Sequence, residues 1–149
     1  MLASGSADHS IRLWDTRSGT LLRILRSTGN KIWSLAFSPD GKLLASGSGN
    51  PTGQDYSIRL WDVSSGRQVK RLLGHTAGVS DLAFAPDGKK LASGSADGSV
   101  RVWDVGSGKE IRKYPGQEYD YRKAAISPDG RVLALGCRET PVDPNRTDG

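Results

Sequence analysis

Apolar and polar residues alternate along three short segments that each end in Trp-Asp. The segment 57–62 reads Ser-Ile-Arg-Leu-Trp-Asp, and closely similar hexamers occupy 10–15 and 99–104. A period of two is typical of a strand whose two sides face different surroundings. Three further segments are small and apolar enough to predict strands that are mostly buried: 32–37, 79–84 and 123–126. Since no stretch of the sequence has a sustained helical period, the pattern predicts an all-β protein.

The Trp-Asp pairs belong to an internal repeat. Trp14, Trp61 and Trp103 are 47 and 42 residues apart, and three Pro-Asp-Gly tripeptides keep the same two spacings. Proline and glycine at these positions favour a hairpin turn, so each unit is expected to hold four strands. The five extra residues of the longer repeat lie between Gly49 and Tyr56. The repeat divides the chain into units of roughly 1–26, 27–73, 74–115 and 116–137, with 138–149 as a loop or a truncated tail.

These features resemble the WD-repeat family of β-propellers, whose blades are four-stranded sheets around a central channel. The resemblance rests on the Trp-Asp endings, the pair Gly74-His75 and a repeat near 42 residues, and it extends from Leu2 to about Cys137. It implies a partial WD-repeat propeller, with about three and a half four-stranded blades in an open arc.

In that family a His, a Ser or Thr, an Asp and the Trp form a structural hydrogen-bond network within each blade. In the third unit the matching residues are His75, Ser93, Asp97 and Trp103. In the second unit they are Ser46, Asp55 and Trp61, and in the first Ser4, Asp8 and Trp14. The second unit has Thr28 where the His would be, and the fourth has Gln117 in place of His and Leu135 in place of Ser. We expect the blades without His to be less rigid.

Ser, His and Asp are also the ingredients of a hydrolytic triad. Here the Ser and Asp recur together with a Trp in other units, which indicates architecture, and the sequence contains no Gly-x-Ser-x-Gly elbow. His9, His75 and Cys137 share no metal-ligand spacing, and no phosphate-binding glycine loop is present. We therefore predict no enzyme, no metal site and no cofactor.

The resemblance also implies a binding face, because loops between and within the blades of this family meet at one mouth of the channel. The candidate partner-binding residues are Lys31, Trp33, Gln54, Ser80, Asp120 and Arg122. Trp33 stands where the other units have Ser80 and Arg122, and an aromatic beside a lysine is typical of a binding hot spot. The alternative is that Trp33 packs between blades, and the sequence leaves both interpretations open.

Charge and composition narrow the choice of partner. The chain has 149 residues, 21 of them basic and 16 acidic, for a formal charge of +5. The cations are spread along the units with acidic residues between them, so nucleic acid is not the expected partner. The sequence has no apolar run of membrane-spanning length and no apparent signal peptide, and it holds one cysteine. We expect no membrane association and a cytoplasmic location.

Three and a half units are fewer than the four to eight blades of closed propellers. Either the chain is a fragment of a longer WD-repeat protein, or two copies associate through their open blade edges to make seven blades. We favour the fragment, because the opening strand would be duplicated in such an exchange. The sequence leaves open whether Asp148 or Glu139 takes the turn position of the last unit.

The function that these features favour is a non-catalytic protein–protein interaction scaffold with a protein or peptide partner. Two alternatives from other classes remain: a regulatory or sensor segment of a larger multidomain enzyme, and a weak nucleic-acid-binding surface. A degenerate remnant without function is a third, suggested by the departures in the fourth unit.

Overall fold

The computed structural model describes residues 1–27, 31–49, 55–115, 119–127 and 131–139. Within these ranges the regular structure is entirely strand, and no helix there is long and apolar enough to cross a membrane. The strands are β1 (Leu2–Gly5), β2 (Ser10–Trp14), β3 (Leu21–Arg26), β4 (Lys31–Phe37), β5 (Leu43–Gly49), β6 (Ile58–Asp62), β7 (Gln68–Leu72), β8 (Val79–Phe84), β9 (Lys90–Ser95), β10 (Ser99–Asp104), β11 (Glu110–Pro115), β12 (Tyr119–Ile126) and β13 (Leu133–Glu139). The prediction of an all-β protein is confirmed.

The strands form four antiparallel sheets, which we call blades 1 to 4 in chain order. Blade 1 holds β1-β2-β3, blade 2 holds β4-β5-β6-β7, blade 3 holds β8-β9-β10-β11 and blade 4 holds β12-β13. Within each blade, every strand pairs with the next one along the chain, as expected for hairpins joined by short turns. The last described residue, Glu139, pairs with Tyr119 in the ladder between β13 and β12.

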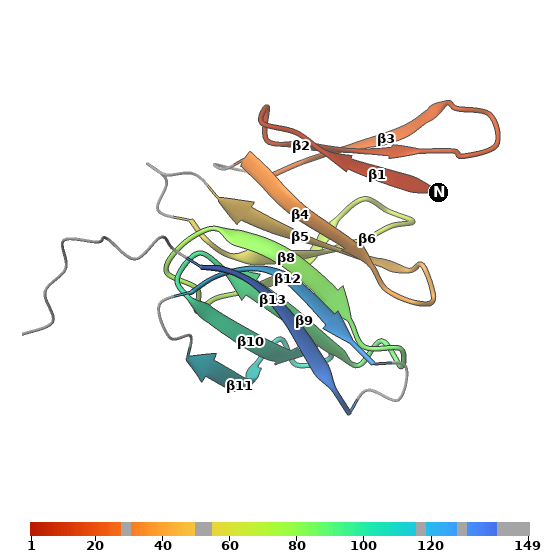
Figure 1. Ribbon diagram of the computed structural model, residues 1–149. Helices are drawn as coiled ribbons and strands as arrows, with labels where there is room; N and C mark the ends of the chain where they lie inside the picture. Colours follow the sequence, from red (N-terminus) through yellow and green to blue (C-terminus); the bar gives the residue numbers. More distant parts are fainter. Residues whose placement is uncertain (28–30, 50–54, 116–118, 128–130, 140–149) are drawn as a thin grey trace, which may run out of the picture.

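The blades follow one another in space as they do in the sequence. Figure 1 shows blade 1 at the top, then blades 2 and 3, and β12 of blade 4 lies against β8 and β9. The first strands of neighbouring blades pack together, β4 on β8 and β8 on β12. In the described part of the chain the four sheets do not close into a ring, which confirms the partial propeller.

Two clusters of buried side chains hold the blades together. One joins blades 1 and 2 and includes Leu13, Leu25 and Trp61, and the other joins blades 2 and 3 and includes Leu60 and Trp103. Both tryptophans pack against the preceding blade. Because a strand in the middle of this stack has apolar neighbours on both faces, the segments with continuous small and apolar residues become the innermost strands.

The Asp of each Trp-Asp pair builds the turn that follows. In blade 3 an Oδ of Asp104 accepts a hydrogen bond from the Ser107 amide at 2.6 Å, and the Gly108 amide donates to the Asp104 carbonyl at 2.8 Å. Gly108 has φ near +75°, a left-handed conformation that a residue without Cβ adopts at little cost. The turns 15–19 and 62–66 are built in the same way.

Candidate functional site

Blade 3 contains the full four-residue network in its interior. The indole Nε1–H of Trp103 donates to Ser93 Oγ at 2.8 Å, and the same Oγ lies 2.8 Å from His75 Nε2. His75 Nδ1 lies 2.8 Å from Asp97 Oδ2. The rings of His75 and Trp103 meet edge to face, with centroids 6.0 Å apart. The four side chains therefore form one continuous chain of contacts, from Trp103 in the third strand through Ser93 in the second strand and His75 to Asp97 in the turn between these strands.

Asp97 is the last residue of this network, and its carboxylate carries a negative charge. Burial alone would raise the pKa of Asp97, but hydrogen bonds from His75, from the Ser99 hydroxyl and from the Thr76 amide together hold that pKa well below its usual value. A carboxylate that accepts this many hydrogen bonds is fixed in position. Asp97 thereby ties the loop that enters blade 3 to the turn between β9 and β10.

Blade 2 keeps the Trp–Ser hydrogen bond of the network, but arginines take the place of the histidine beside the aspartate. Trp61 Nε1 donates to Ser46 Oγ at 2.9 Å, as in blade 3. Asp55, however, forms ion pairs with two arginines: its Oδ2 lies 2.5 Å from Arg59 Nη2, and its Oδ1 lies 2.9 Å from Arg71 Nη2. Burial would raise the pKa of Asp55, but its hydrogen bonds with Ser57 and Arg71 and the charge of Arg59 lower it to about 2. Thr28, which stands at the histidine position, lies outside the described residues.

Arg59 is a residue of the network that the sequence interpretation did not include. Its side chain is 3% exposed, and Nη1 donates to Ser27 Oγ at 2.8 Å. In blade 1 Arg12 likewise pairs with Asp8 at 2.8 Å. In blade 3, where His75 holds the aspartate, Arg101 turns to Glu110 at 2.6 Å instead. The arginine of the Trp-Asp segment pairs with the aspartate in blades 1 and 2, where no histidine contacts that aspartate. Because an arginine recurs in every Trp-Asp segment, the sequence held a signal for this role.

Blade 1 completes the comparison. Trp14 Nε1 donates to Ser4 Oγ at 3.0 Å, and Asp8 Oδ1 accepts from the Ser10 hydroxyl and amide at 2.6 and 3.0 Å. These bonds and the one from Arg12 lower the pKa of Asp8 from its usual value. Each of the three described Trp-Asp strands is thus anchored through its indole to a serine on the neighbouring strand.

The geometry of the network is that of a structural element. Ser93 is 0% exposed and its hydroxyl is engaged by both Trp103 and His75, so neither its oxygen nor the imidazole faces a space that a substrate could enter. Among the residues that the structure describes, no group of three or more His, Cys, Asp or Glu side chains is placed to hold a metal ion.

The candidate binding residues lie at a repeated irregularity of the innermost strands. Trp33 in β4, Ser80 in β8 and Arg122 in β12 each occupy a register shift, where one residue has no counterpart on the paired strand. Such a β-bulge bends the strand and re-aims the extra side chain. The structure therefore places the bulged residue of blades 2, 3 and 4 at the same point of each ladder.

Trp33 is the large aromatic among these residues. It is 45% exposed, and its ring lies over two buried glycines, Gly49 of its own blade and Gly78 at the start of blade 3. A Cβ at Gly49 would lie 2.5 Å from the Trp33 ring, and a Cβ at Gly78 would overlap it further. The six-membered ring of the indole thus packs against two blades while the residue remains 45% exposed, and the interpretation of Trp33 as a binding anchor stays a prediction.

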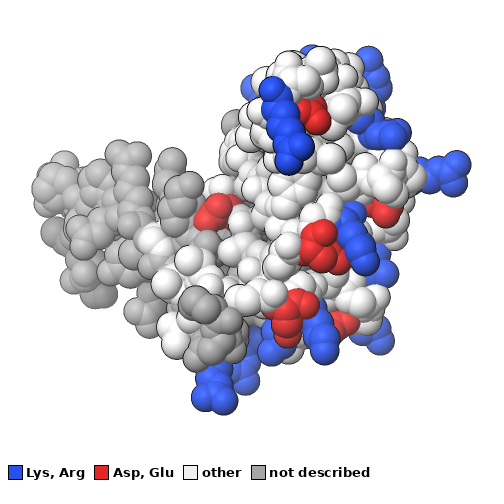
Figure 2. All heavy atoms as spheres, turned by 90° about the vertical axis from the view of Figure 1, so that its right-hand side faces the viewer, with Lys and Arg blue, Asp and Glu red and all other residues white. Residues whose placement is uncertain are grey.

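The other candidate residues are only partly described. Lys31 is exposed, and Ser80 is half-buried with its Oγ donating to the Gly94 carbonyl at 3.3 Å. Asp120 and Arg122 belong to β12, and the backbone of Asp120 pairs with Arg138. Gln54 lies outside the described residues. On the face shown in Figure 2, acidic side chains lie between basic ones, so that face has no large area of one sign of charge.

Repeated antiparallel sheets of up to four strands, stacked through their innermost strands, define the blades of a β-propeller, and three of them are anchored by a Trp–Ser hydrogen bond. A family model described as "WD domain, G-beta repeat" matches residues 1–15, 19–62 and 66–104. The chain therefore belongs to the WD-repeat family.

Similar segments occur in much longer proteins. The chain is 49% identical over 45 residues to the nuclear distribution protein PAC1 of Mycosarcoma maydis, covering 30% of this chain and 10% of that protein. It is 48% identical over 42 residues to the F-box-like/WD repeat-containing protein TBL1X of Mus musculus, covering 28% and 8%, and 50% identical over 46 residues to coronin-7 of Rattus norvegicus, covering 31% and 5%. The matched segments span a tenth or less of each relative.

Proposed function

We propose that this protein is a non-catalytic interaction module that binds a protein or peptide through the mouth of the arc around Trp33. The observation that carries the proposal is the accessible indole at the β-bulge of β4. Lys31 and Ser80 add a cation and a hydroxyl from the same strand and from the next blade. An aromatic anchor with a polar surround is the usual composition of a binding hot spot.

The packing of Trp33 supports this role. Because its ring rests on Gly49 and Gly78, the side chain has already lost much of its rotamer freedom before any partner arrives. Ordering a free side chain on binding costs about 0.5–1.5 kcal/mol, and a pre-positioned indole avoids most of that cost. A bulge that holds an aromatic outward on a rigid sheet is therefore suited to recognition.

The family supports the class of function. WD-repeat proteins generally bind protein partners, and the network of this chain is occupied in structural bonds. The relatives are far longer than this chain, so their individual partners are not carried over to it. A cytoplasmic location remains part of this proposal, in keeping with the single cysteine of the sequence.

The test is a selection of peptides from a displayed library on the immobilised chain, followed by calorimetric titration of the selected peptide. We expect Trp33→Ala to weaken binding by about tenfold or more, since truncation of a hot-spot aromatic costs roughly 2 kcal/mol. Val69→Ala is the matched control, because Val69 is 50% exposed on the outer strand β7.

Equal losses in the two variants, or unchanged binding to Trp33→Ala, would contradict the proposal. The free energy of unfolding of both variants is measured alongside, so that a loss of fold is not taken for a loss of contact.

A further inference from the structure

The outer strands of blades 1 and 2 each contact a turn of the following blade. Arg23 in β3 donates from Nη1 to the Ser65 carbonyl at 3.1 Å and from Nη2 to the Ser64 carbonyl at 2.9 Å. A Cβ at Gly66, which closes this turn, would come within 3.0 Å of the Leu25 side chain. Blade 1 therefore contacts the turn after the Trp-Asp strand of blade 2 through one cation and one apolar residue.

Blades 2 and 3 repeat this contact. Lys70 and Leu72 of β7 stand at the positions of Arg23 and Leu25, counted from the residue that pairs with the Trp of each blade. A Cβ at Gly108 would lie 3.3 Å from Leu72 and 3.4 Å from Lys70. Because the following blade covers them, Leu25 and Leu72 are only 2% and 1% exposed.

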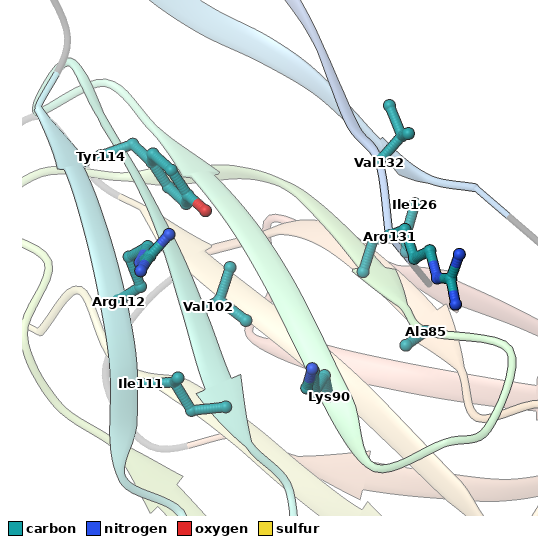
Figure 3. A pocket seen from close by; sticks show the side chains of 9 residues that line it. All are labelled: Ala85, Lys90, Val102, Ile111, Arg112, Tyr114, Ile126, Arg131 and Val132. Carbon is teal, nitrogen blue, oxygen red and sulfur yellow. The ribbon is translucent and has the colours of Figure 1, made fainter. Parts of the chain in front are cut away.

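Blade 3 carries the same surface, and no turn from the described residues lies on it. Arg112 and Tyr114 of β11 stand at the two positions, and Tyr114 is 39% exposed. They line a groove of about 360 Å³ together with Val102, Ile111 and three residues near the hairpin of blade 4 (Figure 3). Lys90, Arg112 and Arg131 give this groove three cations, and no carboxylate is among its described lining residues.

Blade 1 carries the matching turn, also uncovered. In the turn 15–19, an Oδ of Asp15 accepts from the amides of Arg17 and Ser18 at 2.7 and 2.9 Å, and the Gly19 amide donates to the Asp15 carbonyl at 2.9 Å. The same bonds build the turns at Gly66 and Gly108. A Cβ at Gly19, however, would meet no atom within 4 Å, whereas Cβ atoms at those two glycines would meet the preceding blade.

We infer that the groove on blade 3 binds the turn 15–19 of a second copy of this chain. The carbonyls of Arg17 and Ser18 stand at the positions of Ser64 and Ser65, so Arg112 makes the contact in trans that Arg23 makes within the chain. Lys90 and Arg112, the two groove cations that belong to blade 3, also complement the carboxylate of Asp15 and the exposed carbonyls of the turn.

This contact requires an exchange of strands. For the turn to reach the groove in the repeated geometry, β1 of the second copy takes the place of β13 beside β12. The two strands are closely matched, since Leu2-Ala3-Ser4-Gly5 aligns with Leu133-Ala134-Leu135-Gly136, and no described strand pairs with the other edge of β1. The exchange gives blade 1 a fourth strand, and β13 is the duplicated strand that it displaces.

The resulting contact is head to tail, because groove and turn are different surfaces. Head-to-tail contacts form a ring when the rotation between copies closes. Two copies supply six four-stranded blades in this arrangement, a number within the range of closed propellers. We therefore expect a dimer rather than an open chain of copies.

Sedimentation equilibrium of the 149-residue chain tests the inference. We expect a species of twice the 15.9 kDa chain mass, and a dissociation constant raised about tenfold or more by Arg112→Glu, which places a carboxylate against the turn carbonyls. Lys113→Glu is the matched control, because it makes the same charge change at the next, exposed residue of β11, outside the groove lining. Adding Ser18→Arg to the Arg112→Glu chain is expected to restore association, since the new cation faces the new carboxylate.

Three results would overturn the inference. The first is a chain whose sedimenting mass stays at 15.9 kDa at every concentration. The second is a dimer that Arg112→Glu and Lys113→Glu weaken equally. The third is a double variant that gains nothing from Ser18→Arg. Thermal unfolding of each variant shows whether the fold is retained, so that a loss of association is read only from folded chains.

Discussion

A buried serine hydroxyl determines how each Trp-Asp strand is held. Ser93 accepts the indole N–H of Trp103 and contacts His75, so one small side chain satisfies two larger ones inside the blade. An unpaired buried donor costs roughly 1–3 kcal/mol, which is why the same Ser–Trp pair recurs in blades 1 and 2. The aspartate at the end of the network is different, since it is charged and its partners vary between blades.

Asp97 makes part of the stability dependent on acidity. Its pKa in the folded chain is lowered, against the effect of burial, by bonds from His75 and Ser99, so the stability it contributes is present above the unfolded pKa of about 4 and is lost as pH falls toward the folded value. We expect the difference in unfolding free energy between the wild type and Asp97→Asn to be constant near neutral pH and to narrow below about pH 4. Urea titrations over a series of pH values measure this difference, and one that persists unchanged in acid would contradict the assignment.

At the scale of the strand, the arginine of each Trp-Asp segment adapts to its blade. Arg59 is buried between Asp55 and Ser27, whereas Arg12 is 33% exposed beside Asp8. Both lie on equivalent positions of equivalent strands, so the difference comes from the neighbours and not from the segment. An ion pair that is withdrawn from water depends far more on both partners being present than one at the surface.

We therefore expect Arg59→Ala to destabilise the chain by roughly 3 kcal/mol, because it leaves Asp55 partly buried with one cation fewer. Arg12→Ala is the matched variant in blade 1 and is expected to cost much less, since water screens that pair. Chemical unfolding of the two variants measures both effects. A loss for Arg12→Ala as large as that for Arg59→Ala would show that burial does not decide the strength of the pair.

The repeat made the strands predictable, because each appears at fixed spacing in several units, and the resemblance to the WD-repeat family implied the serine–tryptophan pairs. The role of Arg59 was not predictable in the same way. An arginine at an alternate position of a strand is normally solvent-facing, and only the packing of β6 brings it to Ser27. The β-bulge at Trp33 leaves no trace in composition either, so the exposure of its ring depends on how β4 pairs with β5.

At the scale of the whole molecule, the blades form an arc whose two ends differ. Apolar clusters fill the spaces between blades 1 and 2 and between blades 2 and 3. Beyond blade 3, the groove around Arg112 and Tyr114 carries the same contact positions without a described turn on them. The same packing thus recurs inside the arc from blade to blade. We expect binding at two surfaces, around Trp33 and in this groove.

The exchange rates of the four indole Nε1 protons, followed by nuclear magnetic resonance, test the account most directly. Trp14, Trp61 and Trp103 each donate to a serine, whereas Trp33 is 45% exposed, so we expect three protected indole protons and one that exchanges rapidly with water. Ser46→Ala is expected to abolish the protection of Trp61 and to leave the protection of Trp103 in place. Slow exchange of the Trp33 proton would contradict the claim that its indole faces the solvent. A Trp61 proton whose exchange Ser46→Ala does not change would contradict the claim that the Trp–Ser hydrogen bond anchors the blade.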